Sequence, residues 1–210
     1  MRLNGDRPKP LVEVRGRPLL WHVVSIFAAQ GFREFLLLTG YRGEEIAAWS
    51  QWPAGAAVEC VDTGLDTPTG GRVHRVRDRL DGAFCLTYAD GLADVDLAAL
   101  RARHIEAGGL ATMTVVRPEL PFGLALVDGA DRVTGFREKP RAEDWVNGGF
   151  FMLEPGALDY LSDDSVLERE PLERLAADGA LAAYRHTGYW RCLDTYKDAV
   201  ALEEEWRFGG

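Results

Sequence analysis

Isolated aspartates follow two apolar segments of this chain, at places where a carboxylate could hold a metal ion. Asp90 comes directly after the apolar run at 83–88, and Asp194 lies between a strand-like segment and a helix-like one. A carboxylate at the end of a strand can bind a hard cation that takes its remaining ligands from water and from substrate phosphates. We therefore predict that Asp90 and Asp194 share one divalent cation, although a turn or a helix N-cap would also account for each aspartate alone.

Two lysines lie next to prolines, at the ends of predicted strands. Lys9 is flanked by Pro8 and Pro10. Proline fixes its own φ and biases the preceding residue toward extended geometry, so Lys9 is held on a stiff, non-helical segment. Such a lysine could direct its charge at an anion, while a solvated linker residue is the simpler interpretation. Lys139 repeats the arrangement, because it follows a predicted strand and precedes Pro140.

Glycine-rich stretches mark two further places where a ligand could approach the backbone. Thr-Gly-Gly-Arg at 69–72 opens a predicted helix directly after a strand, and helix N-termini attract anions. Arg72 lies in the first turn, where a cation opposes the helix dipole, which indicates a role toward a ligand; a solvated arginine is the alternative. Gly148 and Gly149 lie inside a predicted strand, which they weaken unless a ligand or another backbone must come close.

Strand-like and helix-like segments alternate along the chain, and this alternation is typical of βαβ units with a mostly parallel sheet. The predicted strands are 11–14, 34–39, 56–62, 83–88, 110–117, 122–127, 132–137, 147–153 and 181–186, and the predicted helices are 18–30, 43–50, 69–80, 96–107, 171–178 and 194–206. We therefore expect one α/β domain over residues 1–210, with a β-rich second half. Ligands of such sheets bind at the carboxyl ends of the strands, where the residues above are placed.

Composition and charge exclude several classes of function. The net charge of −9 disfavours non-specific binding to nucleic acid or to anionic membranes. No apolar run approaches the roughly 18–20 residues that span a bilayer, and the chain opens on no signal peptide. The three cysteines are widely spaced and the four histidines show no ligand spacing, so we expect reduced thiols in a cytoplasmic protein and no zinc site.

Eight segments, in their order along the chain, resemble the sugar nucleotidyltransferases, and within that family the glucose-1-phosphate cytidylyltransferases. They are RPKPLVEVRGRPLLWHVV, GYRGEEI, VDTGLDTPTGGRVHRV, FCLTYADGLADV, GFREKP, WVNGGFFML, EREPLERLAADGAL and YWRCLDT. The stretch DTG-x-x-T-x-TGGR is specific to the cytidylyltransferase branch, whereas PKP and EKP are shared more widely. The resemblance covers nearly the whole chain, from about residue 7 to residue 206.

The resemblance implies a Rossmann-like fold and a reaction in which an oxygen of a sugar-1-phosphate attacks the α-phosphorus of CTP, giving a CDP-sugar and pyrophosphate. It implies glucose-1-phosphate as the sugar, Mg²⁺ on Asp90 and Asp194, Lys9 near the α-phosphate, and Lys139 on the sugar phosphate. By the same resemblance, the residues expected around the substrates are Arg2, Thr69, Gly70, Gly71, Arg72, Tyr88, Glu138, Asn147 and Gly148. Such chemistry mainly requires alignment of two anions and neutralisation of phosphoryl charge.

The sequence also departs from the family pattern. Ala89 replaces the first glycine of the family's GDG, and the stretch 43–56 is short for the cytidylyltransferase branch, which affects the family's usual oligomer contacts. The family's first strand and its GGxGTR phosphate loop do not precede the opening MRL, where Arg2 matches the final arginine of that loop. We therefore expect unpaired ladder groups on the neighbouring strands, association through the exposed edge, and slower turnover than in an intact relative.

Two other functions fit parts of the sequence. A catalytically impaired nucleotide-sugar-binding or regulatory homologue would keep the binding residues without the phosphate loop. A glycosyltransferase would use Asp94 and Asp96 as a DxD metal motif, but Asp96 is better explained as a helix N-cap, and this function leaves EKP and TGGR unexplained. The partners expected are CTP and a sugar-1-phosphate, with no nucleic acid or membrane, and a homo-oligomer is compatible with the sequence.

Overall fold

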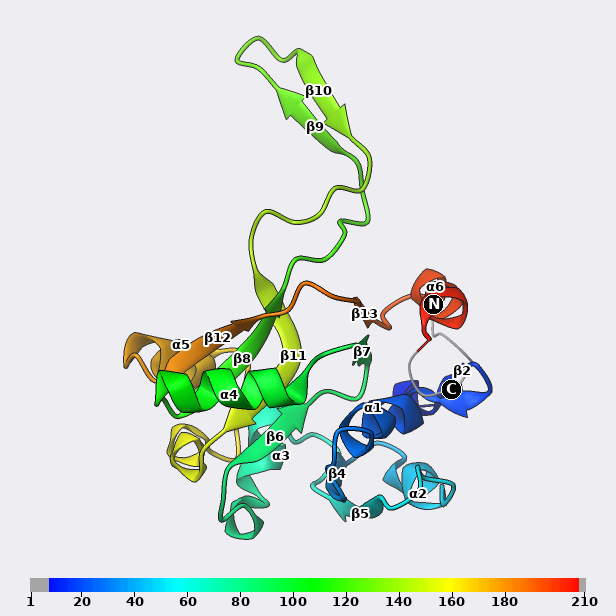
Figure 1. Ribbon diagram of the computed structural model, residues 1–210, viewed down its shortest axis with the longest axis vertical. Helices are drawn as coiled ribbons and strands as arrows, with labels where there is room; N and C mark the ends of the chain where they lie inside the picture. The colour runs from blue at the N-terminus through cyan, green and yellow to red at the C-terminus, as the bar shows by residue number, and fades with distance from the viewer. Residues whose placement is uncertain (1–7, 208–210) are drawn as a thin grey trace.

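The computed structural model describes residues 8–207 and has an α/β architecture with a mixed sheet flanked by helices (Figure 1). The central sheet has the strand order β12-β8-β11-β6. These strands span Leu181–Arg185, Ala111–Val116, Val146–Leu153 and Phe84–Thr87, respectively. β8 and β12 are parallel, whereas β11 runs antiparallel to both β8 and β6. A separate parallel pair consists of β4 (Glu34–Thr39) and β5 (Ala57–Asp62).

Helices flank the strands of the described chain. They are α1 (Leu19–Ala28), α2 (Gly43–Ala47), α3 (Thr69–His74), α4 (Leu97–Ala107), α5 (Glu170–Ala177) and α6 (Tyr196–Glu205), with 3₁₀ turns at Lys9–Leu11, Arg77–Arg79 and Pro155–Tyr160. α4 lies across the central sheet (Figure 1), and its N-cap Asp96 accepts a hydrogen bond from the Ala99 backbone N–H at 2.8 Å. The predicted N-cap role of Asp96 is thereby confirmed.

The core explains the long buried run of β11. It is paired on both edges, so its residues from Gly148 to Leu153 are buried. Successive side chains of a strand point to opposite faces. Accordingly, Phe150 packs in the cluster with α1, while its neighbour Phe151 packs in the cluster with α5. A continuous apolar run is the expected pattern for a strand that is covered on both faces.

Three short two-stranded ladders complete the architecture. β2 (Glu13–Val14) pairs with β3 (Arg17–Pro18), and β7 (Gly91–Ala93) pairs with β13 (Trp190–Cys192). β9 (Leu124–Val127) and β10 (Val133–Arg137) form a hairpin that projects away from the sheets, as Figure 1 shows at the top. We call residues 118–145, which include this hairpin, the arm. No helix among the described residues is long and apolar enough to cross a membrane.

Three predicted elements are clearly shorter in the structure. The predicted strand at 11–14 is limited to β2 (Glu13–Val14), because Leu11 belongs to the 3₁₀ turn Lys9–Leu11, and the turn at Arg15 and Gly16 then folds β2 onto β3. The predicted helix at 43–50 ends at Ala47. The predicted helix at 69–80 ends at His74 and is followed by a separate 3₁₀ turn. The α/β class with a sheet flanked by helices is as predicted. The sheet is mixed rather than mostly parallel, because only β4–β5 and β8–β12 pair in parallel among the described strands and β11 is antiparallel to both of its neighbours.

The two larger sheets share one core but are not joined by strand pairing within residues 8–207. Phe35 and Leu37 of β4 and Cys85 of β6 pack against the same buried cluster. Each of these strands has one paired edge: β4 pairs with β5, and β6 pairs with β11. All four residues of β6 are only half-buried, unlike the buried run of β11. Within residues 8–207, one edge of β4 and one edge of β6 have no strand partner, and the unpaired backbone groups that we expect would lie on these edges.

Candidate functional site

A cavity of about 570 Å³ opens at the carboxyl end of β6. Polar side chains reach it from segments that are far apart in the sequence. The predicted site residues that line it are Lys9, Thr69, Tyr88, Asp90, Asn147, Gly148 and Asp194. This is the sheet edge at which the strand–helix alternation predicts a ligand site.

At one end of the cavity, Lys9 joins the two predicted metal ligands. Its Nζ donates hydrogen bonds to Asp90 Oδ2 and to Asp194 Oδ1, both at 2.8 Å. We call Lys9, Asp90 and Asp194 the carboxylate–lysine cluster. The ammonium group lies between two carboxylates, which is where a bound cation would interact with both.

The β7–β13 ladder brings the two aspartates together. Gly91 is paired with Cys192, and the Leu193 N–H donates to the Asp90 carbonyl at 2.8 Å. Asp90 and Asp194 lie just outside this ladder, one on each strand. Lys9 is presented from a 3₁₀ turn that begins at the lysine, so the predicted non-helical geometry of the Pro8-Lys9-Pro10 segment is wrong. Backbone pairing thus fixes the carboxylates, and the stiff proline segment fixes the lysine.

The contact between Lys9 and Asp194 shifts the pKa values of these two groups in opposite directions. Burial opposes the charge on Lys9, but the hydrogen bonds to Asp194 and Asp90 outweigh that effect and raise its pKa above 10.5. The hydrogen bond from Lys9 lowers the pKa of Asp194 below 3.8. Both groups are therefore charged at neutral pH, as an ion pair requires.

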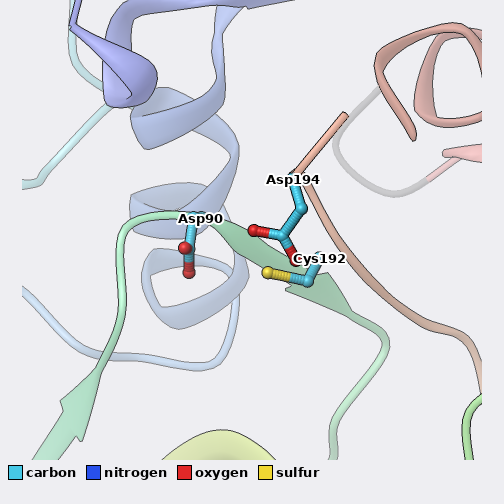
Figure 2. Close-up of side chains that lie close together, drawn as sticks. All are labelled: Asp90, Cys192 and Asp194. Carbon is cyan, nitrogen blue, oxygen red and sulfur yellow. The ribbon is translucent and has the colours of Figure 1, made fainter. Parts of the chain in front are cut away.

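The donor atoms of this cluster fit a divalent cation. One ligand atom each of Asp90, Cys192 and Asp194 lies within 4.8 Å of the others, and Figure 2 shows the thiol directed toward the space between the carboxylates. Mg²⁺ is usually held by one or two carboxylates together with substrate phosphates. Two carboxylates at a cavity wall match that requirement, so the residues present are compatible with the predicted Mg²⁺.

Cys192 is a neighbour that the sequence reasoning treated only as a reduced thiol. Burial, together with the charges of Asp90 and Asp194, raises the pKa of Cys192 to about 12. A usable signal was present in the segment Cys-Leu-Asp. Side chains two residues apart on an extended chain point the same way, so a predicted metal role for Asp194 also directs Cys192 toward the site.

A second polar group lines the cavity around Tyr88. Asn147 Nδ2 donates to Tyr88 Oη at 3.4 Å, and Thr69 Oγ1 donates to Glu168 Oε2 at 2.7 Å. Burial and the carboxylate of Glu168 raise the pKa of Tyr88, which keeps the phenol protonated. The indole of Trp190 donates to the Gly148 carbonyl at 2.7 Å and holds that glycine in the wall. Glu168 is a lining residue that the sequence reasoning did not name, although it lies in the EREPLERL segment.

The other residues of the TGGR stretch serve packing in the described structure. The guanidinium of Arg72 donates to the Thr39 carbonyl at 2.6 Å and to Thr63 Oγ1 at 2.7 Å, so it ties α3 to the ends of β4 and β5. A Cβ on Gly70 would lie 2.8 Å from the Ser165 carbonyl oxygen. A Cβ on Gly71 would collide with the carbonyl oxygen of Asp163. These three residues are not among those that line the cavity.

The remaining candidates lie elsewhere. Glu138 and Lys139 follow β10 on the arm, are exposed, and do not line the cavity. Arg2 lies outside the described residues. Asp94 Oδ1 is 3.1 Å from His186 Nε2, and Asp96 caps α4, so the DxD pair has structural partners rather than a shared ligand site.

Comparison with known proteins identifies the family. Residues 2–191 match the family model described as Nucleotidyl transferase. The chain is 37% identical over 232 residues to the probable glucose-1-phosphate cytidylyltransferase of Bacillus subtilis, covering 99% of this chain and 91% of that protein. It is 36% identical over 234 residues to the glucose-1-phosphate cytidylyltransferase of Salmonella typhimurium, covering 97% and 89%.

Solved structures agree on the fold. HddC from Yersinia pseudotuberculosis, in its complex with GMP-PN, superposes with a TM-score of 0.77 at 19% identity, over 98% of this chain and 93% of that one. The shared architecture shows the fold, and the family model together with the sequence match to the cytidylyltransferases shows the family. This chain belongs to the sugar nucleotidyltransferase family.

Proposed function

We propose that this protein transfers a cytidylyl group from CTP to glucose-1-phosphate, producing CDP-glucose and pyrophosphate. The observation that carries the proposal is the carboxylate–lysine cluster at the wall of a cavity of about 570 Å³. Relatives at 36% and 37% identity that are named as glucose-1-phosphate cytidylyltransferases support the choice of substrates. The family assignment alone supports the coarser statement, nucleotidyl transfer to a sugar phosphate.

The reaction demands mainly charge neutralisation and alignment. An oxygen of the sugar phosphate forms a bond to the α-phosphorus of CTP while the α–β phosphoanhydride bond breaks and pyrophosphate leaves. Asp90 and Asp194 would hold Mg²⁺, which neutralises charge on the triphosphate when bound. With its carboxylate partners engaged in that way, the Lys9 ammonium is free to pair with a phosphate oxygen. A fixed cation that meets developing negative charge is the kind of group that accelerates such a transfer.

The polar group around Tyr88 is suited to orient a substrate. Thr69 and Tyr88 offer hydroxyl groups, Asn147 offers an amide, and Glu168 offers a carboxylate acceptor, all in the same cavity. Sugar hydroxyls and the exocyclic amine of cytosine are donors and acceptors of the matching kind. For Lys139 and Glu138, the proposed contacts with the sugar phosphate and the sugar rest on the family resemblance, since both residues lie outside the cavity lining.

The experiment is pyrophosphate release from CTP and glucose-1-phosphate in the presence of Mg²⁺, with UTP, dTTP and ATP in parallel. The proposal predicts release with CTP at a rate at least about tenfold above the other nucleotides, because a base-reading site that leaves polar groups unpaired discriminates strongly. Equal release with CTP and UTP would overturn the choice of nucleotide. Absence of release with every nucleotide would overturn the proposed enzyme.

A non-catalytic nucleotide-sugar-binding protein is the second candidate. It is favoured by one observation: of the two lysines predicted at the phosphates, Lys9 lines the cavity and Lys139 does not. Thermal stabilisation by CTP with Mg²⁺ or by CDP-glucose, without any pyrophosphate release, would select this function. Release above the background of an Asp90→Asn variant would exclude it.

A further inference from the structure

Cys192 places a sulfur atom beside the two carboxylates of the site. Its Sγ and one oxygen each of Asp90 and Asp194 all lie within 4.8 Å of one another. In Figure 2 the thiol is directed toward the space between the carboxylates. Sulfur is a soft ligand that favours zinc and similar ions, whereas Mg²⁺ prefers oxygen alone. The donor set is therefore mixed in a way that Mg²⁺ binding does not require.

We propose that Cys192 is a third protein ligand, through which the site captures a thiophilic divalent cation such as Zn²⁺ or Co²⁺ by a sulfur–metal bond. The inference rests on the proposed metal role of Asp90 and Asp194, but it does not depend on turnover. Capture by sulfur would hold the cation in place of Mg²⁺ and so regulate the same site. The prediction of no zinc site from the sequence rests on the spacing of histidines and cysteines. Such spacing does not show a thiol that lies beside two carboxylates distant in the sequence.

The geometry requires rotation of the three ligand side chains and withdrawal of the Lys9 ammonium from the carboxylates. Zn–S bonds of about 2.3 Å and Zn–O bonds of about 2.0–2.2 Å in tetrahedral geometry place ligand atoms roughly 3.5 Å apart. The present separation is at most 4.8 Å, and rotation of the half-buried Asp90 and Cys192 side chains and of the exposed Asp194 side chain would close it. The position is already one that suits a cation, since Lys9 Nζ lies 2.8 Å from both carboxylates. The fourth ligand, a water or a phosphate oxygen, would come from the cavity.

The binding step balances in charge and atoms. The Sγ–H bond of Cys192 breaks, its proton goes to solvent, and the sulfur lone pair forms the bond to the cation. The Lys9 ammonium leaves the carboxylates and remains protonated. One proton is therefore released for each cation bound, which is the expected signature of a thiol ligand.

The other thiols of the chain are matched controls. Cys85 is half-buried, as Cys192 is, and its Sγ lies 3.9 Å from Met152 Sδ rather than near a carboxylate pair. Among residues 8–207, Asp90, Cys192 and Asp194 form the one group of three such side chains close enough to share an ion. Cys85→Ser thus removes a thiol without touching the proposed site.

The test is titration of the full chain with Co²⁺, after reduction with a phosphine reductant, and detection of the near-ultraviolet sulfur-to-cobalt charge-transfer band. The band is expected in the wild type and in Cys85→Ser, and it is expected to disappear in Cys192→Ser and to weaken strongly in Asp194→Asn. Zn²⁺ should remove it by competition at lower concentration than Mg²⁺. Circular dichroism and the thermal midpoint of each variant show that it is folded.

Two results would overturn the inference. One is a wild-type protein that binds Co²⁺ without the charge-transfer band, and the other is a band that persists in Cys192→Ser. Loss of the band in Cys85→Ser alone would assign the sulfur to the wrong residue and would also overturn it. These outcomes are separate from the proposed function, because Mg²⁺-dependent pyrophosphate release is measured without any thiophilic ion.

Discussion

The carboxylate–lysine cluster and the arm carry the two predicted lysines in very different surroundings. Lys9 is held by two hydrogen bonds of 2.8 Å, at a cavity wall built by a strand ladder and a proline-stiffened segment. Lys139 lies on the arm, where Phe122 (76% exposed) and Phe136 (64% exposed) also face solvent. The difference shows that the carboxylate–lysine cluster, where a cation would bind, is already held together by hydrogen bonds and strand pairing in the folded chain. The predicted sugar-phosphate end is carried by a hairpin that packs little against the sheets.

The largest effect should follow from removal of one carboxylate of the cluster. Asp90→Asn keeps the shape of the side chain but removes the charge that a cation requires. We expect pyrophosphate release to fall by about 10²–10³-fold, the typical loss of one preorganised charged group, with little change in the thermal midpoint. Asp131→Asn, in the exposed turn of the arm, is the control and should release pyrophosphate like the wild type. Equal rates for the two variants would remove Asp90 from the reaction.

The next prediction compares the two lysines directly. Lys9→Met should lower kcat/KM by about 10²-fold, because a cation at the phosphates is lost from a preassembled site. Lys139→Met should mainly raise the KM for glucose-1-phosphate and leave the KM for CTP unchanged, because its predicted partner is the sugar phosphate. Steady-state kinetics with each substrate varied in turn measures both. A larger loss of kcat/KM in Lys139→Met than in Lys9→Met would contradict the prediction that the carboxylate–lysine cluster contributes more to the reaction than the arm.

Substitution of a glycine tests whether the TGGR stretch serves packing. Gly71→Ala would drive a Cβ against the Asp163 carbonyl, whereas Gly129→Ala, in the turn of the arm, meets nothing within 4 Å. We expect Gly71→Ala to destabilise the protein by about 1–3 kcal/mol, as overpacking usually does, and Gly129→Ala to be nearly neutral. Chemical denaturation gives both values. A neutral Gly71→Ala that weakens only CTP binding would instead assign this glycine to the ligand.

The smallest predicted effect is the pH dependence of the Lys9–Asp194 pair. The lowered pKa of Asp194 gives stability that is present above 3.8 and is lost as the pH falls through the folded-state value. The raised pKa of Lys9 gives stability that is present below 10.5 and is lost as the pH rises through its folded-state value. Both groups are partly exposed, so the pair should contribute about 1 kcal/mol or less.

The measurement for this pair is the thermal midpoint of the wild type minus that of Lys9→Met, recorded across the pH range. The difference should be greatest between the two pKa values and should shrink in acid. Asp90→Asn keeps the Lys9–Asp194 contact and serves as the control, since its midpoint should still fall in acid as the wild type does. A difference in thermal midpoint that grows below pH 4 would contradict a lowered pKa of Asp194 in the folded protein.

Sequence reasoning located the parts of the site that end long, strongly patterned elements. Asp90 follows an apolar run, and the Gly-Gly pair of β11 lies at the cavity as predicted. The reasoning placed Asp90 and Asp194 together but missed the short elements that do so and the thiol beside them. β7 and β13 have three residues each, which is too few for a periodic pattern, yet their pairing brings Asp90, Cys192 and Asp194 together. Short length also limits the strand predicted at 11–14, because Leu11 belongs to a 3₁₀ turn and only Glu13–Val14 pair as a strand.

The role of a glycine is a second feature that the sequence leaves ambiguous. A glycine that admits a ligand and a glycine that admits another backbone look identical in the sequence. Gly148 lies at the cavity, whereas Gly70 and Gly71 lie against the backbone of residues 163–165. Arg72 shows the same limit for charge. The predicted helix at 69–80 put it in a first turn, but α3 ends at His74, so Arg72 lies in the last turn, where a cation is favourable, and it donates to Thr39 and Thr63. Long-range packing decides such cases, and the local sequence does not report it.

The most direct test of the central claim is calorimetric titration of CTP into the wild type and into Asp90→Asn, each with Mg²⁺ and with a chelator. If the carboxylate–lysine cluster is the cation and triphosphate end of the site, the wild type binds CTP only with Mg²⁺. In Asp90→Asn, that dependence is then lost together with most of the affinity. CTP binding by the wild type that is equally tight with the chelator, or that is unchanged in Asp90→Asn, would contradict the account.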